Sequence, residues 1–237
     1  MSGPDTMTRR IAIIPARGGS KRIPNKNIRD FCGKPMIAHI LHAARASKLF
    51  DVIHVSTESL HIRDVVDNLG FSVDFMRPDR LADDYTPIMP VLRYVLEIYA
   101  SRGQVFDQVW LLMACAPLVR NSDLIQASEL FDQSGGTSQV LAVSEYPVPI
   151  EWAFSRALDR KMTPIYPGMF AVRSQDIEKK YFDAGMFAVY PAKRVLAFEG
   201  AGSDEGSVGY VIPKGMAIDI DDAADWALAE AIYKMKV

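Results

Sequence analysis

The residues best suited to chemistry lie near the N-terminus, between positions 17 and 34. This stretch holds six Lys or Arg residues against a single acid, Asp30. Two adjacent glycines, Gly18 and Gly19, permit backbone conformations in which successive amide groups point at one anion. Cations combined with free backbone amides favour phosphate as the ligand. The cations are Arg17, Lys21, Arg22, Lys26, Arg29 and Lys34.

The position of this basic loop strengthens the phosphate interpretation. The apolar run Ile11–Ile14 precedes it and predicts a buried strand, and open α/β sheets bind ligands just beyond the carboxyl ends of their strands. Neither the Gly-x4-Gly-Lys-Ser/Thr string nor the Gly-x-Gly-x-x-Gly string occurs here. Charge carried on side chains suits a triphosphate that is held and then split. A solvated basic turn is the alternative, and an isolated Gly-Gly pair would favour it.

A second group of chemically suited residues lies near the C-terminus, in Ile218-Asp-Ile-Asp-Asp222. On an extended segment the alternation places Asp219 and Asp221 on one face. Two close carboxylates repel each other unless a cation lies between them, and Mg²⁺ binds one or two carboxylates together with substrate phosphates. We therefore expect a Mg²⁺ site at Asp219 and Asp221. The alternative for such acids is helix capping, which is our interpretation of Asp222.

Two further loops follow predicted strands and are expected to line the same crevice. The stretch from Arg77 to Tyr85 is polar, and an ordinary connection is its alternative interpretation. The stretch Leu112–Leu118 contains small residues that would let a base or a sugar approach the backbone. Within it Cys115 lacks an acid–base partner at suitable spacing, so we interpret this thiol as a packing residue and not as a nucleophile.

Strands and helices alternate along most of the chain. This order predicts an α/β fold with a doubly wound, mostly parallel sheet, in a single domain over residues 1–237. In the last helix we expect an inward face of Ala224, Leu228, Ala231, Ile232 and Met235. The expected helices lie within 35–44, 62–69, 88–99, 121–131 and 222–235. The expected strands are 11–14, 51–56, 71–75, 109–113, 139–143, 184–190, 209–213 and 216–220.

The alternation breaks at residues 146–182. Prolines and aromatic residues mix there without a clean period, which is typical of an arm and not of a core layer. Apolar groups on an arm need a partner surface, so we expect this segment to form a homodimer interface. A long loop folded onto its own domain is the alternative.

Composition narrows the function classes. The 237 residues carry a formal charge of −2, which gives no support to nucleic-acid binding. Two cysteines are too few for a disulfide framework and suggest a reducing compartment. No run of 18 apolar residues occurs, so we expect a cytoplasmic protein with no membrane segment.

The chain resembles the acylneuraminate cytidylyltransferases, which join CMP to nine-carbon 2-keto-3-deoxy sugar acids. The most specific match is Ile13-Ile-Pro-Ala-Arg-Gly-Gly-Ser-Lys-Arg-Ile-Pro-Asn-Lys-Asn27. Supporting matches are Val55-Ser-Thr57, Arg77-Pro78 and Asp219-Ile-Asp221. The resemblance spans nearly the whole chain. It implies a Rossmann-like nucleotidyltransferase fold, CTP and a nine-carbon sugar acid as substrates, Mg²⁺ as cofactor, and a homodimer with an arm that reaches across to the partner.

The resemblance also implies roles for particular residues. Residues matching Arg17, Lys21 and Lys26 hold the nucleotide phosphates, and residues matching Asn27 and Arg77 help to place the nucleoside. Asp219 and Asp221 would bind Mg²⁺, and Arg17, Lys21 and Asp221 would be catalytic. Arg173 would bind the sugar carboxylate, for which the guanidinium fork is suited. The remaining residues implied in substrate binding are Ala16, Gly18, Ala114 and Asp183.

One departure from the sialic acid pattern bears on the sugar. The family usually carries Gln and Thr where this chain has Met113 and Cys115. The short Ala-x-Ala-Pro form, Arg173-Ser-Gln-Asp176 and Phe182–Phe187 look like the pseudaminic acid branch. We therefore expect a pseudaminic acid cytidylyltransferase. A sialic acid or Kdo-type enzyme is the first alternative. A silent nucleotide-sugar binding protein is the second, although it should have lost the basic loop or the Asp pair.

Overall fold

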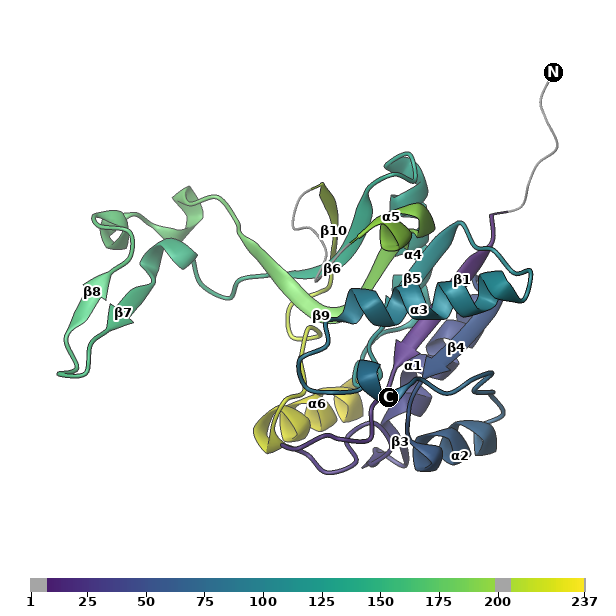
Figure 1. Cartoon of the computed structure of the whole chain (residues 1–237). Coiled ribbons are helices and arrows are strands. Elements are labelled where there is room, and N and C mark those ends of the chain that lie inside the picture. Colours follow the sequence, from purple (N-terminus) through teal and green to yellow (C-terminus); the bar gives the residue numbers. More distant parts are fainter. Residues whose placement is uncertain (1–7, 199–205, 237) are drawn as a thin grey trace, which may run out of the picture.

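A six-stranded sheet forms the centre of the protein, which a computed structural model describes over residues 8–198 and 206–236 (Figure 1). The strand order is β10-β6-β9-β5-β1-β4. Only β9 runs antiparallel to its neighbours, β5 and β6. The mostly parallel sheet predicted from the sequence is therefore confirmed. The strands are β1 (Arg10–Pro15), β4 (Val52–Ser56), β5 (Gln108–Leu112), β6 (Gln139–Glu145), β9 (Tyr181–Pro191) and β10 (Ser207–Val211).

Helices cover both faces of the sheet, as doubly wound folds require. One face carries α1 (Met36–Ser47), α2 (Leu60–Asn68), α4 (Asn121–Gln133) and α6 (Ala223–Lys236), and the other carries α3 (Ile88–Ser101) and α5 (Ala192–Ala197). Strand β1 shows why both faces are covered. Ala12 and Ile14 enter the first core cluster, whereas Ile11 and Ile13 enter the second, and all four are fully buried. Within the described residues, no helix is long and apolar enough to cross a membrane.

The basic loop is followed by a small hairpin of β2 (Asp30–Phe31) and β3 (Lys34–Pro35). A short 3₁₀ helix, η1 (Asp79–Leu81), lies in the connection that leads to α3. Between β6 and β9 the chain leaves the sheet and projects to one side of the body as an arm (Figure 1). The arm contains η2 (Ile150–Trp152), β7 (Phe154–Arg156), β8 (Met162–Pro164), η3 (Met169–Ala171) and η4 (Ser174–Asp176).

Two of the expected strands are wrong. Residues 71–75 and 216–220 are irregular, although their side chains alternate as in a strand. Phe71 packs against one core cluster and Phe75 against the other, but β4 is the edge of the sheet and no further strand pairs with it. In the second segment Met216, Ile218 and Ile220 are buried, while turns replace ladder bonds. Alternation of more and less buried side chains thus occurs here without backbone pairing.

The expected inward face of α6 is also wrong in part. Ile232 packs against the core as predicted, but Ala224, Leu228, Ala231 and Met235 are exposed. The helix is anchored by Trp226, whose ring meets Phe31 edge-on at 5.4 Å and lies under the Arg29 guanidinium at 5.0 Å. The indole is the largest apolar group in the helix, and burying it rotates Leu228 toward solvent.

Replacing Trp226 with Ala should therefore lower the free energy of unfolding by about 3 kcal/mol or more, through lost burial and the cavity left behind. Leu228→Ala, on the same helix, is the control, because a side chain that is 53% exposed contributes little. Urea unfolding of the two variants measures the difference. A larger loss for Leu228→Ala than for Trp226→Ala would contradict the orientation of α6.

Candidate active site

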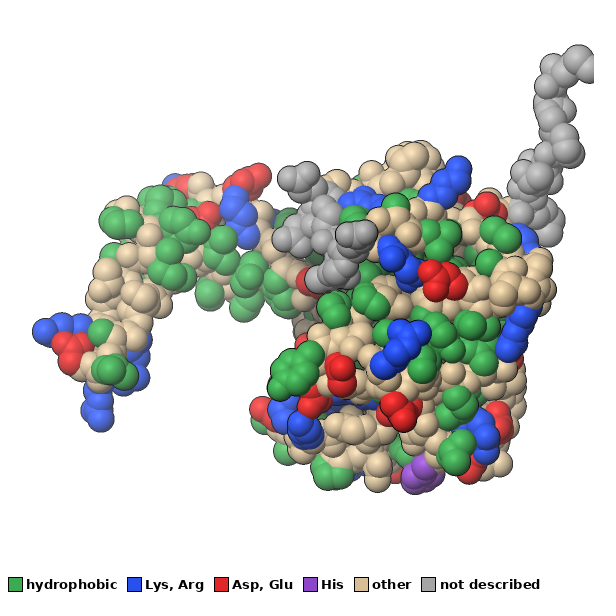
Figure 2. Space-filling model, in the orientation of Figure 1, with side chains coloured by type: hydrophobic (Ala, Val, Ile, Leu, Met, Phe, Trp, Pro, Cys, Tyr) green, Lys and Arg blue, Asp and Glu red, His purple; other side chains and the backbone are tan. Residues whose placement is uncertain are grey.

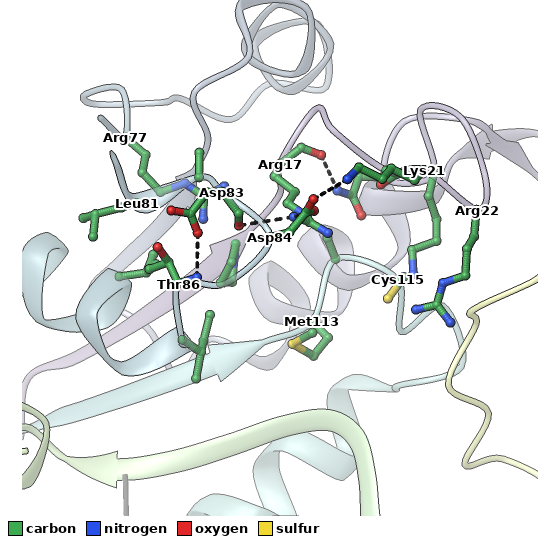
Figure 3. A pocket seen from close by; sticks show the side chains of 18 of the residues that line it. Arg17, Lys21, Arg22, Arg77, Leu81, Asp83, Asp84, Thr86, Met113 and Cys115 are labelled. Carbon is green, nitrogen blue, oxygen red and sulfur yellow. Dashed lines mark hydrogen bonds and ion pairs between the residues drawn. The ribbon is translucent and has the colours of Figure 1, made fainter. Parts of the chain in front are cut away.

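A cavity of about 360 Å³ opens beyond the carboxyl ends of β1 and β5 (Figure 3). Its walls come from the basic loop, from the connection leading to α3 together with the first turn of that helix, and from the loop after β5. The two loops predicted to line one crevice, residues 77–85 and 112–118, both contribute to the lining of this cavity. The lining includes Arg17, Lys21, Arg22, Lys26, Asn27, Arg77, Leu81, Asp83, Asp84, Met113, Ala114, Cys115 and Asp221.

Two cations of the basic loop share one carboxylate. Arg17 donates from Nη1 to Asp84 Oδ1 at 2.6 Å and to the backbone oxygen of Asp83 at 3.2 Å. Lys21 Nζ donates to the other oxygen of Asp84. Figure 3 shows the Asp84 side chain lying between the two cations. The hydrogen bonds from Lys21 and then Arg17 hold the pKa of Asp84 below its usual value.

Two further cations of the loop, Arg22 and Lys26, lie at Asp221. Arg22 Nη2 is 2.9 Å from Asp221 Oδ1, and Lys26 Nζ is 3.7 Å from the same oxygen. Lys26 also donates to the backbone oxygen of Ile220 at 2.6 Å. The sequence places these residues almost two hundred positions apart, and the fold joins the basic loop to the segment before α6. Positive charge is therefore concentrated at one wall of the cavity. It is balanced by Asp84, from the connection that leads to α3, and by Asp221, from the segment before α6.

A buried ion pair fixes the backbone of the basic loop. Arg77 donates from Nη2 to Glu58 Oε2 at 3.0 Å, and the two side chains are only 5% and 18% exposed. Glu58 Oε1 accepts a hydrogen bond from the backbone nitrogen of Gly18 at 2.7 Å. Asn27 adds a second tie by donating to the backbone oxygen of Arg17 at 3.0 Å. Gly18, Asn27 and Arg77 thus support the shape of the loop, and Asn27 and Arg77 also line the cavity.

The Asp pair has the chemistry that a hard cation needs. Partial desolvation and the charge of Asp221 raise the pKa of Asp219. Among the described residues, none donates a hydrogen bond to the Asp219 carboxylate. Capping is done instead by Asp222, whose Oδ1 accepts from the backbone nitrogens of Ala224 and Asp225 at 2.8 and 3.0 Å. The Asp219 carboxylate is therefore not used in capping, and carboxylate oxygens of this kind are ligands that suit Mg²⁺.

No group of three His, Cys, Asp or Glu side chains within the described part of the chain is placed to hold a metal ion. A Mg²⁺ site at Asp219 and Asp221 alone stays a prediction, since Mg²⁺ usually keeps waters and binds substrate phosphates in addition to one or two carboxylates. Arg22 and Lys26 both lie at Oδ1 of Asp221, and no described cation is paired with its Oδ2.

The remaining predicted residues divide into those at the cavity and those away from it. Ala114 lines the cavity, whereas Ala16 does not: it is fully buried, and its backbone nitrogen donates to the backbone oxygen of Ser56. Arg173 lies on the arm, paired with Asp176 at 2.8 Å, and does not line the cavity of its own chain. Asp183 also lies outside the lining, in β9, where its carboxylate accepts from the backbone nitrogen of Gly185. Burial raises the pKa of the Cys115 thiol, which agrees with a packing role.

Two acids at the site were missed from the sequence. Glu58 follows the end of β4, and Asp84 sits in the stretch expected to line the crevice, yet neither was singled out. The sequence feature that could have identified them is their position along the chain. Both acids lie in loops at the carboxyl edge of the sheet, opposite a loop with an excess of cations.

Removing Glu58 should cost far more stability than removing an exposed acid. Glu58→Ala leaves Arg77 charged and buried without a partner, which lowers the free energy of unfolding by about 3 kcal/mol or more. Asp64→Ala, whose partner Arg63 is exposed, should cost under about 1 kcal/mol. Denaturant unfolding compares them, and equal losses would mean that the Arg77–Glu58 pair does not stabilise the fold.

Comparison with known proteins places this site in a family. The model of the family described as Cytidylyltransferase matches residues 11–102, which contain the basic loop and Arg77. A pseudaminic acid cytidylyltransferase of Campylobacter jejuni is 37% identical over 95% of this chain and 96% of its own length. A CMP-N,N'-diacetyllegionaminic acid synthase of Legionella pneumophila is 31% identical, again over 95% and 96%.

A solved structure agrees in fold. The CMP:2-keto-3-deoxy-manno-octonic acid synthetase complexed with CTP superposes with a TM-score of 0.69, over 97% of this chain and all of the other, at 17% identity. At that identity the likeness concerns the fold alone. The two relatives, each more than 30% identical and covered almost in full, show that the chain belongs to the cytidylyltransferase family of CMP-sugar-acid synthetases, as its basic loop and Asp pair predicted.

Proposed function

We propose that this chain transfers CMP from CTP to a nonulosonic acid, with pseudaminic acid as the preferred substrate, and releases pyrophosphate. The observation that carries the proposal is the convergence of Arg17, Lys21, Lys26 and Arg77 on one cavity beside Asp221. The relative that is named a pseudaminic acid cytidylyltransferase supports the choice of sugar. Two free thiols suit a reducing compartment such as the cytoplasm.

In this reaction the anomeric hydroxyl oxygen of the sugar acid attacks the α-phosphorus of CTP. The new oxygen–phosphorus bond forms as the bond to the oxygen of the β-phosphate breaks, and the hydroxyl proton is released to solvent. Positioning and charge neutralisation therefore carry most of the catalysis. Arg17 and Lys21 would neutralise the departing pyrophosphate. Asp219 and Asp221 would hold Mg²⁺, which when bound supplies a divalent charge against the phosphates.

The substrate assignment is tested by pyrophosphate release from CTP with four sugar acids: pseudaminic acid, N,N'-diacetyllegionaminic acid, N-acetylneuraminic acid and Kdo. We expect the highest kcat/KM with pseudaminic acid. The legionaminic acid is the second candidate, because the relative at 31% identity is named for it. Release of pyrophosphate with none of the four acids would refute the proposed transfer of CMP to a sugar acid.

Lys21→Ala should lower kcat/KM for CTP by about 100-fold, because it removes one of the charges that face the phosphates. The fold should survive, since the Lys21 side chain is 78% exposed. Lys34→Ala removes the same charge from the following hairpin, outside the lining of the cavity, and serves as the control. Similar turnover for the two variants at limiting CTP would remove Lys21 from the phosphate site.

The metal assignment is tested by the dependence of the initial rate on Mg²⁺ concentration. Asp221→Asn keeps the size but loses the charge, so it should shift half-saturation to higher Mg²⁺. Asp222→Asn is a matched control, because Asn caps a helix as well as Asp does. A chelator should abolish activity in the wild type. A chelator-resistant enzyme, or identical Mg²⁺ curves for both variants, would leave Asp221 as a partner of Arg22 only.

We infer further that the arm makes a homodimer interface. Many of its large apolar side chains are exposed, and Figure 2 shows hydrophobic groups gathered along the arm between its tip and the body. A contiguous exposed apolar surface marks a site of protein association. Docking on a second copy would also explain why Arg173, expected to bind the sugar carboxylate, is remote from the cavity of its own chain. The exposed apolar residues include Val148, Phe154, Leu158, Met162, Ile165, Tyr166 and Phe170.

Phe170→Glu should convert a dimer into a monomer, because Phe170 is 72% exposed on the arm and a buried unpaired charge opposes association. Val105→Glu introduces the same charge at a 66% exposed apolar residue outside the arm and should leave the dimer intact. Light scattering at micromolar protein gives the mass. A monomeric wild type with full activity would refute the interface.

A further inference from the structure

The cations expected to hold phosphate already hold an anion of the protein itself. Asp84 offers one carboxylate oxygen to Arg17 at 2.6 Å and the other to Lys21, which is how a phosphate would use two neighbouring oxygens. The three side chains meet at the wall of the cavity (Figure 3). A triphosphate and the Asp84 carboxylate therefore compete for the same two charges.

The segment that carries Asp84 is held at both ends but lightly tied between them. At its start the backbone nitrogen of Arg77 donates to Thr57 at 2.8 Å, and its guanidinium pairs with Glu58. At its end the segment enters α3. Between these anchors Asp83 folds the chain locally by accepting from the backbone nitrogens of Tyr85 and Thr86 at 2.9 and 2.6 Å.

The exposure of this segment suits movement. Tyr85, at its tip, is 91% exposed, so displacing residues 82–86 from the cavity wall would give up little buried apolar area. The ion pairs of Asp84 are themselves partly exposed, with the Asp84 side chain at 35% and Lys21 at 78%. Such pairs are weak and exchange partners readily. A polyanion with several charges should displace the Asp84 carboxylate from Arg17 and Lys21, and a small anion should displace it only in part.

We propose that Asp84 is an internal competitor of phosphate, which occupies Arg17 and Lys21 in the free enzyme and is displaced by the triphosphate. The inference rests on the proposed function and adds a role in turnover. After transfer, pyrophosphate remains on the same cations, and the returning carboxylate of Asp84 helps to expel it. Asp84 is thus a positioning residue that sets the affinity for both the substrate phosphates and the leaving group.

Calorimetric titration of inorganic pyrophosphate in metal-free buffer tests this directly. Asp84→Asn keeps the size of the side chain and removes its charge, so the competing state is lost. The apparent Kd for pyrophosphate should fall by about tenfold, as it does when a binding-competent state rises from a tenth of the population to nearly all of it. Asp84→Glu retains the carboxylate and should stay close to the wild type.

Asp79→Asn is the matched control. It makes the same change of charge in the same segment, but no described cation is paired with Asp79, which is exposed. It should leave pyrophosphate affinity close to that of the wild type, which separates local competition from a general change in charge. Circular dichroism and thermal melts verify that each variant is folded.

Hydrogen exchange gives a second measurement, in which the effect of pyrophosphate on the wild type is one that a purely structural role of Asp84 would not produce. Pyrophosphate should raise amide exchange within residues 82–86 of the wild type, and Asp84→Asn should show the raised exchange without any ligand. Unchanged or weaker pyrophosphate binding in Asp84→Asn would overturn the proposal, since it would make Asp84 a bystander or a support of the site. Failure of wild-type protein to bind pyrophosphate would overturn it as well. Because this titration uses neither CTP nor a sugar acid, its result is independent of the activity assay that tests the proposed function.

Discussion

The buried pair of Arg77 and Glu58 is the interaction on which the rest of the site depends. It joins the loops that follow β1 and β4 to the segment that leads to α3, because Glu58 binds both the Arg77 guanidinium and the Gly18 amide. A Cβ at Gly18 would approach the Ser59 side chain to 3.1 Å, so the two loops pack closely there. Charge removed from water in this way stabilises little by itself, but it fixes the backbone from which the phosphate-facing cations extend.

The free site balances its charges internally. Four cations from one loop meet two carboxylates, Asp84 from one side and Asp221 from the other. A cluster of unpaired like charges would repel itself and strain the loop. Under the proposed function, substrate binding would exchange one set of ionic partners for another, which costs less than creating charge contacts anew. Phosphate would take the cations while a metal ion takes the freed carboxylate.

The sequence was sufficient for those features that depend on local order. The alternation of elements, the glycine-containing basic loop after β1 and the cap at Asp222 all follow from nearest neighbours along the chain. Alternating side chains reported burial correctly at residues 71–75 and 216–220, but a strand also requires a backbone ladder to a neighbouring strand, and neither segment forms one. The inward face of α6 was wrong because Trp226 fits beside Phe31, a contact that no helical periodicity encodes.

The charge partners could not be predicted, because they depend on distance in space. Nothing in the order of residues pairs Asp84 with Arg17, or Asp221 with Arg22, until the carboxyl ends of the strands bring their loops to one edge. The arm poses the same difficulty at a larger scale. Its composition indicates an apolar surface that packs against a partner, whereas a single sequence does not identify the chain that provides this partner.

The arm also has a consequence for how such proteins diversify. Its two ends lie side by side, since Glu145 pairs with Tyr181 across β6 and β9, and Tyr146 donates to the backbone oxygen of Lys180. In topology the arm is thus an overgrown hairpin loop. Closing such a loop costs only about 0.6 kcal/mol more for each doubling of its length. The sheet therefore tolerates large changes here, and lineages can lengthen, shorten or exchange the arm while the catalytic edge keeps its geometry.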